Sequence, residues 1–99
     1  MARLRLTGFL RCRTLEEADR IAPYLDDHVR LTRAEPGCLQ FEVLRSAADP
    51  ACFAVSETFV DAEALEAHRV RAAGTIWARV TAGIPRDYTV TEIDGEAGE

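Results

Sequence analysis

The 99-residue chain contains no lysine and no long hydrophobic run, and each absence argues against a class of protein. All 12 basic residues are arginine, 17 residues are acidic, and the net charge is −5. Nucleic-acid-binding domains present a basic face to phosphates, so we expect no nucleic-acid partner. No stretch approaches the roughly 18 apolar residues of a membrane span, and residues 1–13 are too charged for a signal-peptide core. We therefore expect no membrane partner and a cytoplasmic location.

Metal and cofactor motifs are also missing. Cys12, Cys38 and Cys52 form neither a CxxC pair nor an even disulfide set, so reduced and mostly buried thiols are expected. His28 and His68 are 40 residues apart without a ligand cluster, which predicts no metal site. The chain has no glycine-rich phosphate loop and no nucleophile motif of an acyl-transfer enzyme. We therefore expect neither a nucleotide cofactor nor an acyl-transfer triad.

The first half of the chain predicts a strand, a helical region and a second strand. Apolar and polar residues alternate over residues 3–13, as in a half-buried strand. Thr14, with Glu17 three residues later, begins a helix that runs to about Glu35. Pro23 would kink one continuous helix, and a second helix that begins at Pro23 fits equally well. Residues 38–45 alternate again, with Leu39, Phe41 and Val43 on one face.

The second half predicts two further strands around another helix. A turn at 47–50 leads into a strand over residues 52–59. Asp61 caps a helix whose buried stripe contains Leu65, His68, Ala72 and Ile76, with Gly74 and Gly83 as its weak points. Residues 86–93 form the last strand, and the acidic tail 94–99 is expected to fray.

This β-α-β-β-α-β order predicts a single α+β domain with a core over about residues 3–93. The fold is the ferredoxin-like split sandwich, in which a four-stranded antiparallel sheet carries two helices on one face. A mixed set of side chains falls on the other face: Arg3, Arg5, Thr7, Phe9, Gln40, Glu42, Ala54, Ser56, Thr58, Thr89 and Thr91. A second copy packed there would explain both the mixture and the small size, which predicts a homodimer.

One carboxylate stands in an apolar row and suggests acid–base chemistry. Glu57 shares the inward face of its strand with Phe53, Val55 and Phe59, and His68 lies on the helix that should cover this face. Burial raises a carboxyl pKa, and a neighbouring imidazole can exchange its proton near neutral pH. The alternatives are a buried structural pair, or Glu57 paired with an arginine at the rim of a cleft.

Five further residues are candidates to line a cleft for a small hydrophobic or aromatic substrate: Phe53, Phe59, His28, Trp77 and Tyr88. Trp77 lies nine residues after His68, on roughly the opposite side of a continuous helix, so the two share a cleft only if the helix breaks at Gly74. Otherwise Trp77 is a core or dimer anchor, and His28 packs against the end of the sheet.

The sequence resembles the antibiotic biosynthesis monooxygenase domain family over about residues 4–93. The resemblance rests on these segments: His28, TRAEPGCL at 32–39, FEV at 41–43, the DP turn at 49–50, SETF at 56–59 and DAEALEAH at 61–68. It implies a homodimer with a dimeric α+β barrel and one cleft per subunit. Heme-degrading members use an Asn, which this chain lacks, and a histidine where Ala78 stands here, so no heme is implied.

The implied activity is a cofactor-independent monooxygenase of a small activated aromatic such as a quinol or an anthrone. In this hypothesis the substrate itself reduces dioxygen, His68 is the base and Glu57 orients it. A second hypothesis is a proton-shuttling isomerase of a small metabolite that uses the same pair. A third is a dimer that binds a hydrophobic ligand without catalysis.

Overall fold

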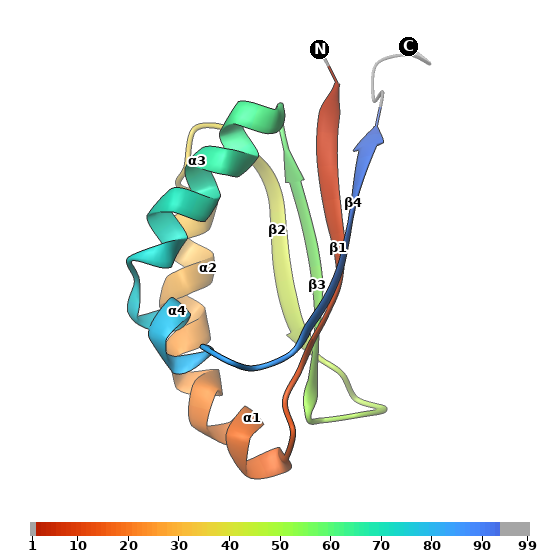
Figure 1. The fold of residues 1–99 in the computed structure, drawn as a ribbon, viewed down its shortest axis with the longest axis vertical. Coiled ribbons are helices and arrows are strands. Elements are labelled where there is room, and N and C mark those ends of the chain that lie inside the picture. The colour runs from red at the N-terminus through yellow and green to blue at the C-terminus, as the bar shows by residue number, and fades with distance from the viewer. Residues whose placement is uncertain (1, 94–99) are drawn as a thin grey trace.

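The computed structural model describes residues 2–93, and the predicted fraying of the tail 94–99 lies outside this range. Its elements follow the predicted order (Figure 1). They are β1 (Arg3–Arg11), α1 (Leu15–Ile21), a 3-10 turn η1 (Ala22–Tyr24), α2 (Leu25–Arg33), β2 (Cys38–Arg45), β3 (Cys52–Phe59), α3 (Ala62–Ala73), α4 (Ile76–Val80) and β4 (Arg86–Ile93).

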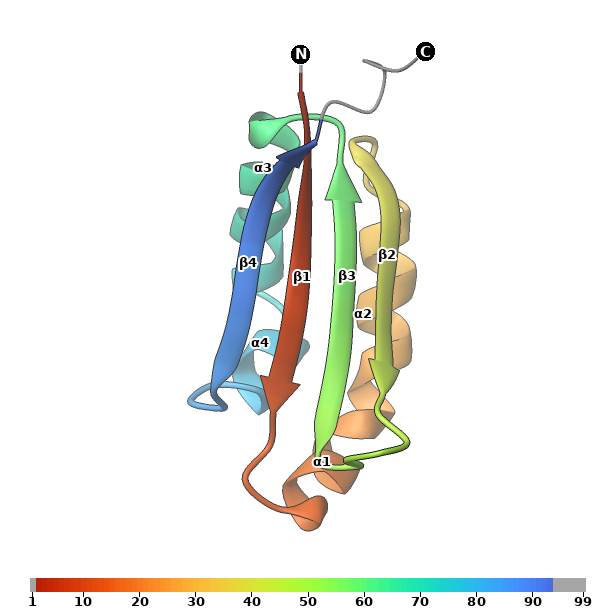
Figure 2. The same ribbon diagram turned by 90° about the vertical axis from the view of Figure 1, so that its right-hand side faces the viewer.

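The four strands form one antiparallel sheet in the order β2-β3-β1-β4. The helices cover one face of this sheet, which we call the inner face, and leave the open face uncovered (Figures 1 and 2). The predicted ferredoxin-like fold is therefore confirmed. Leu39 is an exception to the predicted alternation. It is 50% exposed because a register shift between Cys38 and Gln40 interrupts the pairing of β2 with β3.

The first helical region is broken at Pro23, as one of the two interpretations predicted. Thr14 caps α1, because its hydroxyl accepts a hydrogen bond from the backbone N–H of Glu17 at 3.0 Å. Pro23 cannot donate a backbone hydrogen bond, and the chain passes through the 3-10 turn η1 before α2 begins at Leu25. Pro23 therefore divides this helical region into α1 and α2.

The second helical region also consists of two helices, and this break decides where Trp77 lies. Asp61 caps α3, and α3 ends at Ala73 before Gly74. Thr75 then caps a separate helix, α4. Trp77 is consequently buried, with 9% of its surface exposed, whereas Ile76 is 46% exposed. The predicted place of Ile76 on the buried stripe was wrong, because that stripe assumed one continuous helix.

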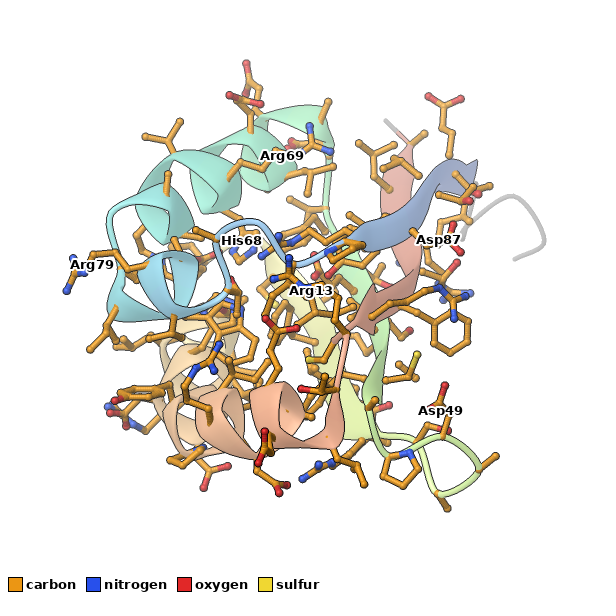
Figure 3. All side chains as sticks on the ribbon, turned by 60° about the horizontal axis from the view of Figure 1, so that its bottom comes forward. Arg13, Asp49, His68, Arg69, Arg79 and Asp87 are labelled. Carbon is orange, nitrogen blue, oxygen red and sulfur yellow. The ribbon has the colours of Figure 1, made fainter. Side chains whose placement is uncertain are left out.

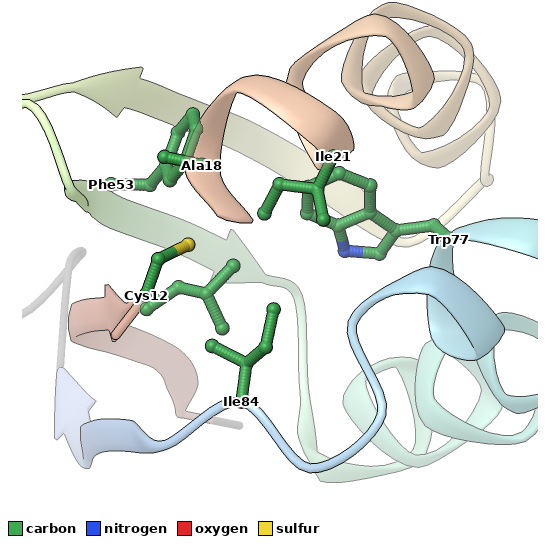
Figure 4. Close-up of a cluster of buried hydrophobic side chains, with 7 residues drawn as sticks. Cys12, Ala18, Ile21, Phe53, Trp77 and Ile84 are labelled. Carbon is green, nitrogen blue, oxygen red and sulfur yellow. The ribbon is translucent and has the colours of Figure 1, made fainter. Parts of the chain in front are cut away.

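A buried apolar cluster joins α1, α4 and the adjoining end of the sheet (Figure 4). Its members are Leu10, Cys12, Ala18, Ile21, Phe53, Trp77 and Ile84. Cys12 and Cys52 are buried thiols and Cys38 is partly buried, all three of them free, in agreement with the sequence. The cluster fixes α4 against the sheet and thereby holds one wall of the site described below.

Gly8 allows β1 to approach β4 closely. Its φ of +151° is rarely adopted by residues with a side chain, and an added Cβ would lie 1.9 Å from the carbonyl oxygen of Asp87. Gly8 pairs with Tyr88 across the two strands. The glycine therefore positions Tyr88 on the inner face of the sheet.

We predict that Gly8→Ala lowers the free energy of unfolding by at least about 2 kcal/mol, because the methyl group meets backbone atoms that cannot rotate away. Gly74→Ala is the matched control. Gly74 has a φ of −94°, and the nearest heavy atom to an added Cβ is 3.8 Å away. This control should change stability by less than about 1 kcal/mol. Urea denaturation measures both variants, and equal effects would contradict the prediction.

Candidate functional site

A cavity of about 230 Å³ lies between the inner face of the sheet and the helices α2, α3 and α4. This volume is slightly below the roughly 300–1,000 Å³ of drug-sized ligand sites, so it suits a small molecule. Strands supply one side and helices the other, and the main side chains are Phe41, Glu57, Tyr88, His28, His68 and Trp77. Eight of the lining side chains are apolar, and six are ionisable: His28, Glu57, His68, Arg69, Arg86 and Tyr88.

Glu57 is the acidic group on the sheet side of the cavity. It lies on β3 between Leu6 of β1 and Phe41 of β2, and it is only 7% exposed. None of the residues 2–93 forms a hydrogen bond with its carboxyl group. Burial raises its pKa to about 7, the positive charge of Arg69 acts in the opposite direction, and the negative charge of Glu35 adds to the rise. Near neutral pH this side chain can therefore either accept or donate a proton.

His68 is held by a carboxylate that the sequence analysis did not single out. Its Nδ1 lies 3.2 Å from both carboxylate oxygens of Glu35. Arg71 donates from Nε to the same carboxylate and from Nη2 to the hydroxyl of Thr32 at 3.1 Å. Thr32 is fully buried and belongs to α2, whereas His68 and Arg71 belong to α3. This network ties the two helices together.

The network also selects the tautomer of His68. The carboxylate of Glu35 accepts hydrogen bonds, so Nδ1 carries the proton and Nε2 is the nitrogen with a free lone pair. Nε2 makes no hydrogen bond within residues 2–93, yet it is not fully buried. Because the ring lines the cavity, Nε2 can contact a ligand there. His68 and Glu57 both line the cavity, but no hydrogen bond or ion pair joins these two side chains.

His28 and Trp77 form an aromatic wall. Their rings stack with centroids 5.4 Å apart and planes inclined by 14°, and the ring of His68 lies 6.0 Å from that of His28. Burial is the largest cause that lowers the pKa of His28 to about 4, and the charges of His68 and Arg71 act in the same direction. His28 is therefore neutral at pH 7, and its Nδ1 is buried without a hydrogen-bond partner. The break at Gly74 brings Trp77 to this wall, as the sequence required for a shared cleft.

The remaining predicted lining residues divide into two groups. Tyr88 lines the cavity, and burial raises the pKa of its phenol. Phe59 lies behind His68, with ring centroids 5.2 Å apart, and Phe53 belongs to the apolar cluster. Both phenylalanines are 1% exposed and neither lines the cavity, because the helices pack directly over them.

Three arginines and one glutamate near the cavity escaped the sequence analysis: Glu35, Arg69, Arg71 and Arg86. Glu35 directly precedes Pro36 at the end of a helix, where an acidic residue is ordinarily a surface residue. The one feature of the sequence that could have identified Glu35 as a site residue is its place within TRAEPGCL, a segment on which the family resemblance rests. Nothing in the periodicity of the chain brings it to His68, which is 33 residues away.

Residues 2–93 contain neither a candidate metal site nor a candidate membrane-spanning helix. No group of three or more His, Cys, Asp or Glu side chains in this part of the chain is arranged to hold a metal ion. Within the same range, no helix combines the length and the apolar character that crossing a membrane requires.

We predict that Glu57 makes stability fall as pH rises. Its pKa is about 7 in the folded protein and near the ordinary 4.5 in the unfolded chain, so between these values only the folded state keeps the proton. The free energy of unfolding should therefore decrease by roughly 3 kcal/mol from about pH 4.5 to about pH 7. Glu57→Gln removes this decrease.

The measurement is urea denaturation of both proteins between about pH 5 and about pH 8. His28 has a lowered pKa and contributes the opposite slope between about pH 4 and pH 6.5, but this contribution is common to both proteins and cancels in their difference. Glu63→Gln, at an exposed carboxyl on α3, is the matched control. Parallel curves for wild type and Glu57→Gln would show the prediction to be wrong.

The architecture matches solved structures over almost its whole length. A structure from Nitrosomonas europaea, named "Putative antibiotic biosynthesis monooxygenase", is 20% identical with a TM-score of 0.79, and the match covers 91% of this chain and 88% of that one. A conserved protein from Methanosarcina mazei is 13% identical with a TM-score of 0.81 and 95% coverage of both chains. At these identities the likeness shows the fold alone.

One structure named "antibiotic biosynthesis monooxygenase" is 26% identical, with a TM-score of 0.65 and coverage of 95% of this chain and 97% of that one. No protein of curated function matches the chain significantly. The family model described as "Antibiotic biosynthesis monooxygenase" matches residues 14–75, which is more than half of the chain and includes Glu35, Glu57 and His68. The chain therefore belongs to the antibiotic biosynthesis monooxygenase family.

Proposed function

We propose that this protein is a cofactor-independent monooxygenase of a small aromatic that loses a proton readily, of the quinol or anthrone type, with His68 as the base. The observation that carries the proposal is the contact of Glu35 with Nδ1 of His68, which leaves Nε2 as a proton acceptor at the cavity. Family membership supports the class of reaction, and the aromatic lining supports a flat substrate.

His68 takes the proton from the substrate at Nε2. The imidazolium that forms is stabilised by the carboxylate of Glu35, which Arg71 holds in place. Glu57, whose pKa is about 7, donates a hydrogen bond to a substrate oxygen when protonated. Glu57 thus acts on the substrate in this proposal, and the orienting role first expected of it falls to Glu35.

The deprotonated substrate supplies the electrons for oxygen reduction. In an anthrone, the carbanion at the ring methylene transfers electrons to dioxygen and a carbon–oxygen bond forms. The resulting peroxide anion takes the proton back from the imidazolium of His68 to give a hydroperoxide. Loss of water from this hydroperoxide leaves a new carbonyl group, so one oxygen atom enters the product and the other leaves as water. The reaction consumes no external reductant, and a largely apolar cavity protects the carbanion from protonation by solvent.

A second candidate is a proton-shuttling isomerase. The specific observation in its favour is that one cavity contains both a base, His68, and a carboxyl group, Glu57, that can donate its proton near neutral pH. Such a pair can move a proton between two carbons without oxygen. Dependence on dioxygen distinguishes the two reactions.

We also propose that a second copy of the chain packs on the open face of the sheet, as in a dimeric α+β barrel. Phe9, Ala54 and Leu44 are cross-strand neighbours that form an apolar strip there, and Phe9 and Leu44 are 38% and 63% exposed. Figure 2 shows that no helix covers this face. An exposed apolar strip on a small domain is typical of an association surface.

The dimer is tested by light scattering. The mass should be near twice the 10.9 kDa of one chain. Ala54→Arg places a charge in the apolar strip and should shift the protein towards the monomer, whereas Val70→Arg, at an exposed position of α3, should not. A wild-type monomer at micromolar concentration would contradict the proposed packing.

The activity is tested by oxygen uptake with a panel of quinols and dihydroanthracenones. Removing a general base slows catalysis by about 100-fold or more, so His68→Ala should reduce uptake by at least this factor. Glu35→Gln keeps the size of the side chain but removes the charge that balances the imidazolium, and should lower kcat with little change in KM.

Uptake that survives in His68→Ala would remove His68 as the base. Uptake no faster than the uncatalysed reaction across the whole panel would contradict the monooxygenase. Isomerisation without oxygen would then favour the second candidate, and ligand binding without any turnover would favour a binding protein.

A further inference from the structure

Arg86 lies at the cavity with a positive charge that no acidic residue balances. Its Nη2 donates to the hydroxyl of Thr81 at 2.7 Å, and its Nη1 donates to the carbonyl oxygens of Ile84 at 3.1 Å and Thr81 at 3.4 Å. All three acceptors are neutral. No carboxylate of residues 2–93 lies within ion-pair distance of this guanidinium. The charge is therefore fixed in position but not neutralised.

Arg86 also stabilises the segment that follows α4, because it donates hydrogen bonds to Thr81 and Ile84. These bonds do not occupy all the donors of its guanidinium. Thr81 is fully buried, and its hydroxyl donates to the carbonyl oxygen of Trp77 at 2.7 Å. A guanidinium has five N–H donors, and the three hydrogen bonds to Thr81 and Ile84 leave two for other acceptors, among them the phenol oxygen of Tyr88. The same guanidinium lines the cavity and lies close enough to Tyr88 to oppose the effect of burial on the pKa of that phenol.

The surroundings favour a ligand with negative charge at this end of the cavity. Arg69, on α3, also lines the cavity. Its ion pair with Glu66, at 3.9 Å, is mostly exposed and therefore weak, and its positive charge also acts on Glu57. Two arginines thus face a site in a protein whose net charge is −5. The opposite wall is the stacked pair of His28 and Trp77, which accepts a flat ring.

We propose that Arg86, together with the hydroxyl of Tyr88, forms a subsite for an anionic oxygen of a flat aromatic ligand whose ring lies against Trp77 and His28. The oxygen belongs to an aryl carboxylate or an ionised phenol, which present the same acceptor chemistry to a guanidinium. This subsite adds an acidic oxygen to the substrate class of the proposed function. It rests on that function only because the substrate is placed in this cavity.

The test measures binding rather than turnover. Trp77 is the one tryptophan of the chain, so its single indole N–H signal in an NMR spectrum reports occupation of the cavity. Naphthalene-2-carboxylate is compared with naphthalene-2-carboxamide, which has the same shape without the charge, and 4-nitrophenolate is compared with 4-nitroanisole. In the wild-type protein each anion should bind about ten-fold more tightly than its neutral partner and should shift the Trp77 signal.

Arg86→Gln should remove the advantage of the anions and leave the affinity of the neutral partners unchanged, and Arg86→Lys should retain part of it. The matched control is Arg79→Gln. Arg79 is on α4 but points away from the molecule (Figure 3), so this variant should bind all four probes as the wild type does. An advantage restricted to the carboxylate pair or to the phenolate pair identifies which anion the subsite prefers.

Four results would overturn the subsite: equal affinity for charged and neutral probes, no binding at millimolar concentration, an equal loss for both kinds of probe in Arg86→Gln, or the same loss in Arg79→Gln. The wild-type comparison needs no variant, so it remains decisive if Arg86→Gln fails to fold. Arg86-dependent binding without oxygen uptake would refute the monooxygenase but keep the subsite. Oxygen uptake without any preference for anions would support the monooxygenase and refute the subsite.

Discussion

The site depends on the interaction of Glu35 with His68 and Arg71. This carboxylate follows α2, and both of its partners lie on α3, so one side chain connects the two helices that enclose the cavity. Gly37 makes the connection possible, because a Cβ at this position would lie 2.4 Å from the Cβ of Ala64 at the start of α3. The close approach of the segment after α2 to α3 brings a nearly buried carboxylate to a buried imidazole, where its charge is least screened.

The cavity separates its ionisable groups by environment. His68 has a fixed tautomer and an ion-paired neighbour, His28 is neutral because it is buried against Trp77, and Glu57 keeps its proton to about pH 7 because burial disfavours its charged form. Arg69 and Arg86 line the same cavity and are both exposed to water. The cavity thus combines neutral or protonated groups, His28 and Glu57, with the positive charges of Arg69 and Arg86. This combination favours an aromatic ring that carries one acidic oxygen.

Local patterns predicted most of the fold. Period-two alternation located the four strands, and the caps Thr14 and Asp61 located the starts of α1 and α3, because strands and caps depend on residues within a few positions of one another. The same alternation placed Glu57 on the inner face. The pattern failed where it was extended across a break, so Ile76 was expected inside although Gly74 ends the helix before it.

The sequence by itself determined the order of the elements, the inward carboxylate of Glu57 and a histidine on the covering helix. Only the tertiary structure decided that His68 contacts Glu35 rather than Glu57, that Phe53 and Phe59 lie outside the cavity, and that Arg86 lines it. Periodicity specifies which face of an element a residue occupies, whereas a contact between residues 33 positions apart depends on how two helices are placed over one sheet. That placement is set by packing along the whole interface, and no short segment of the chain contains it.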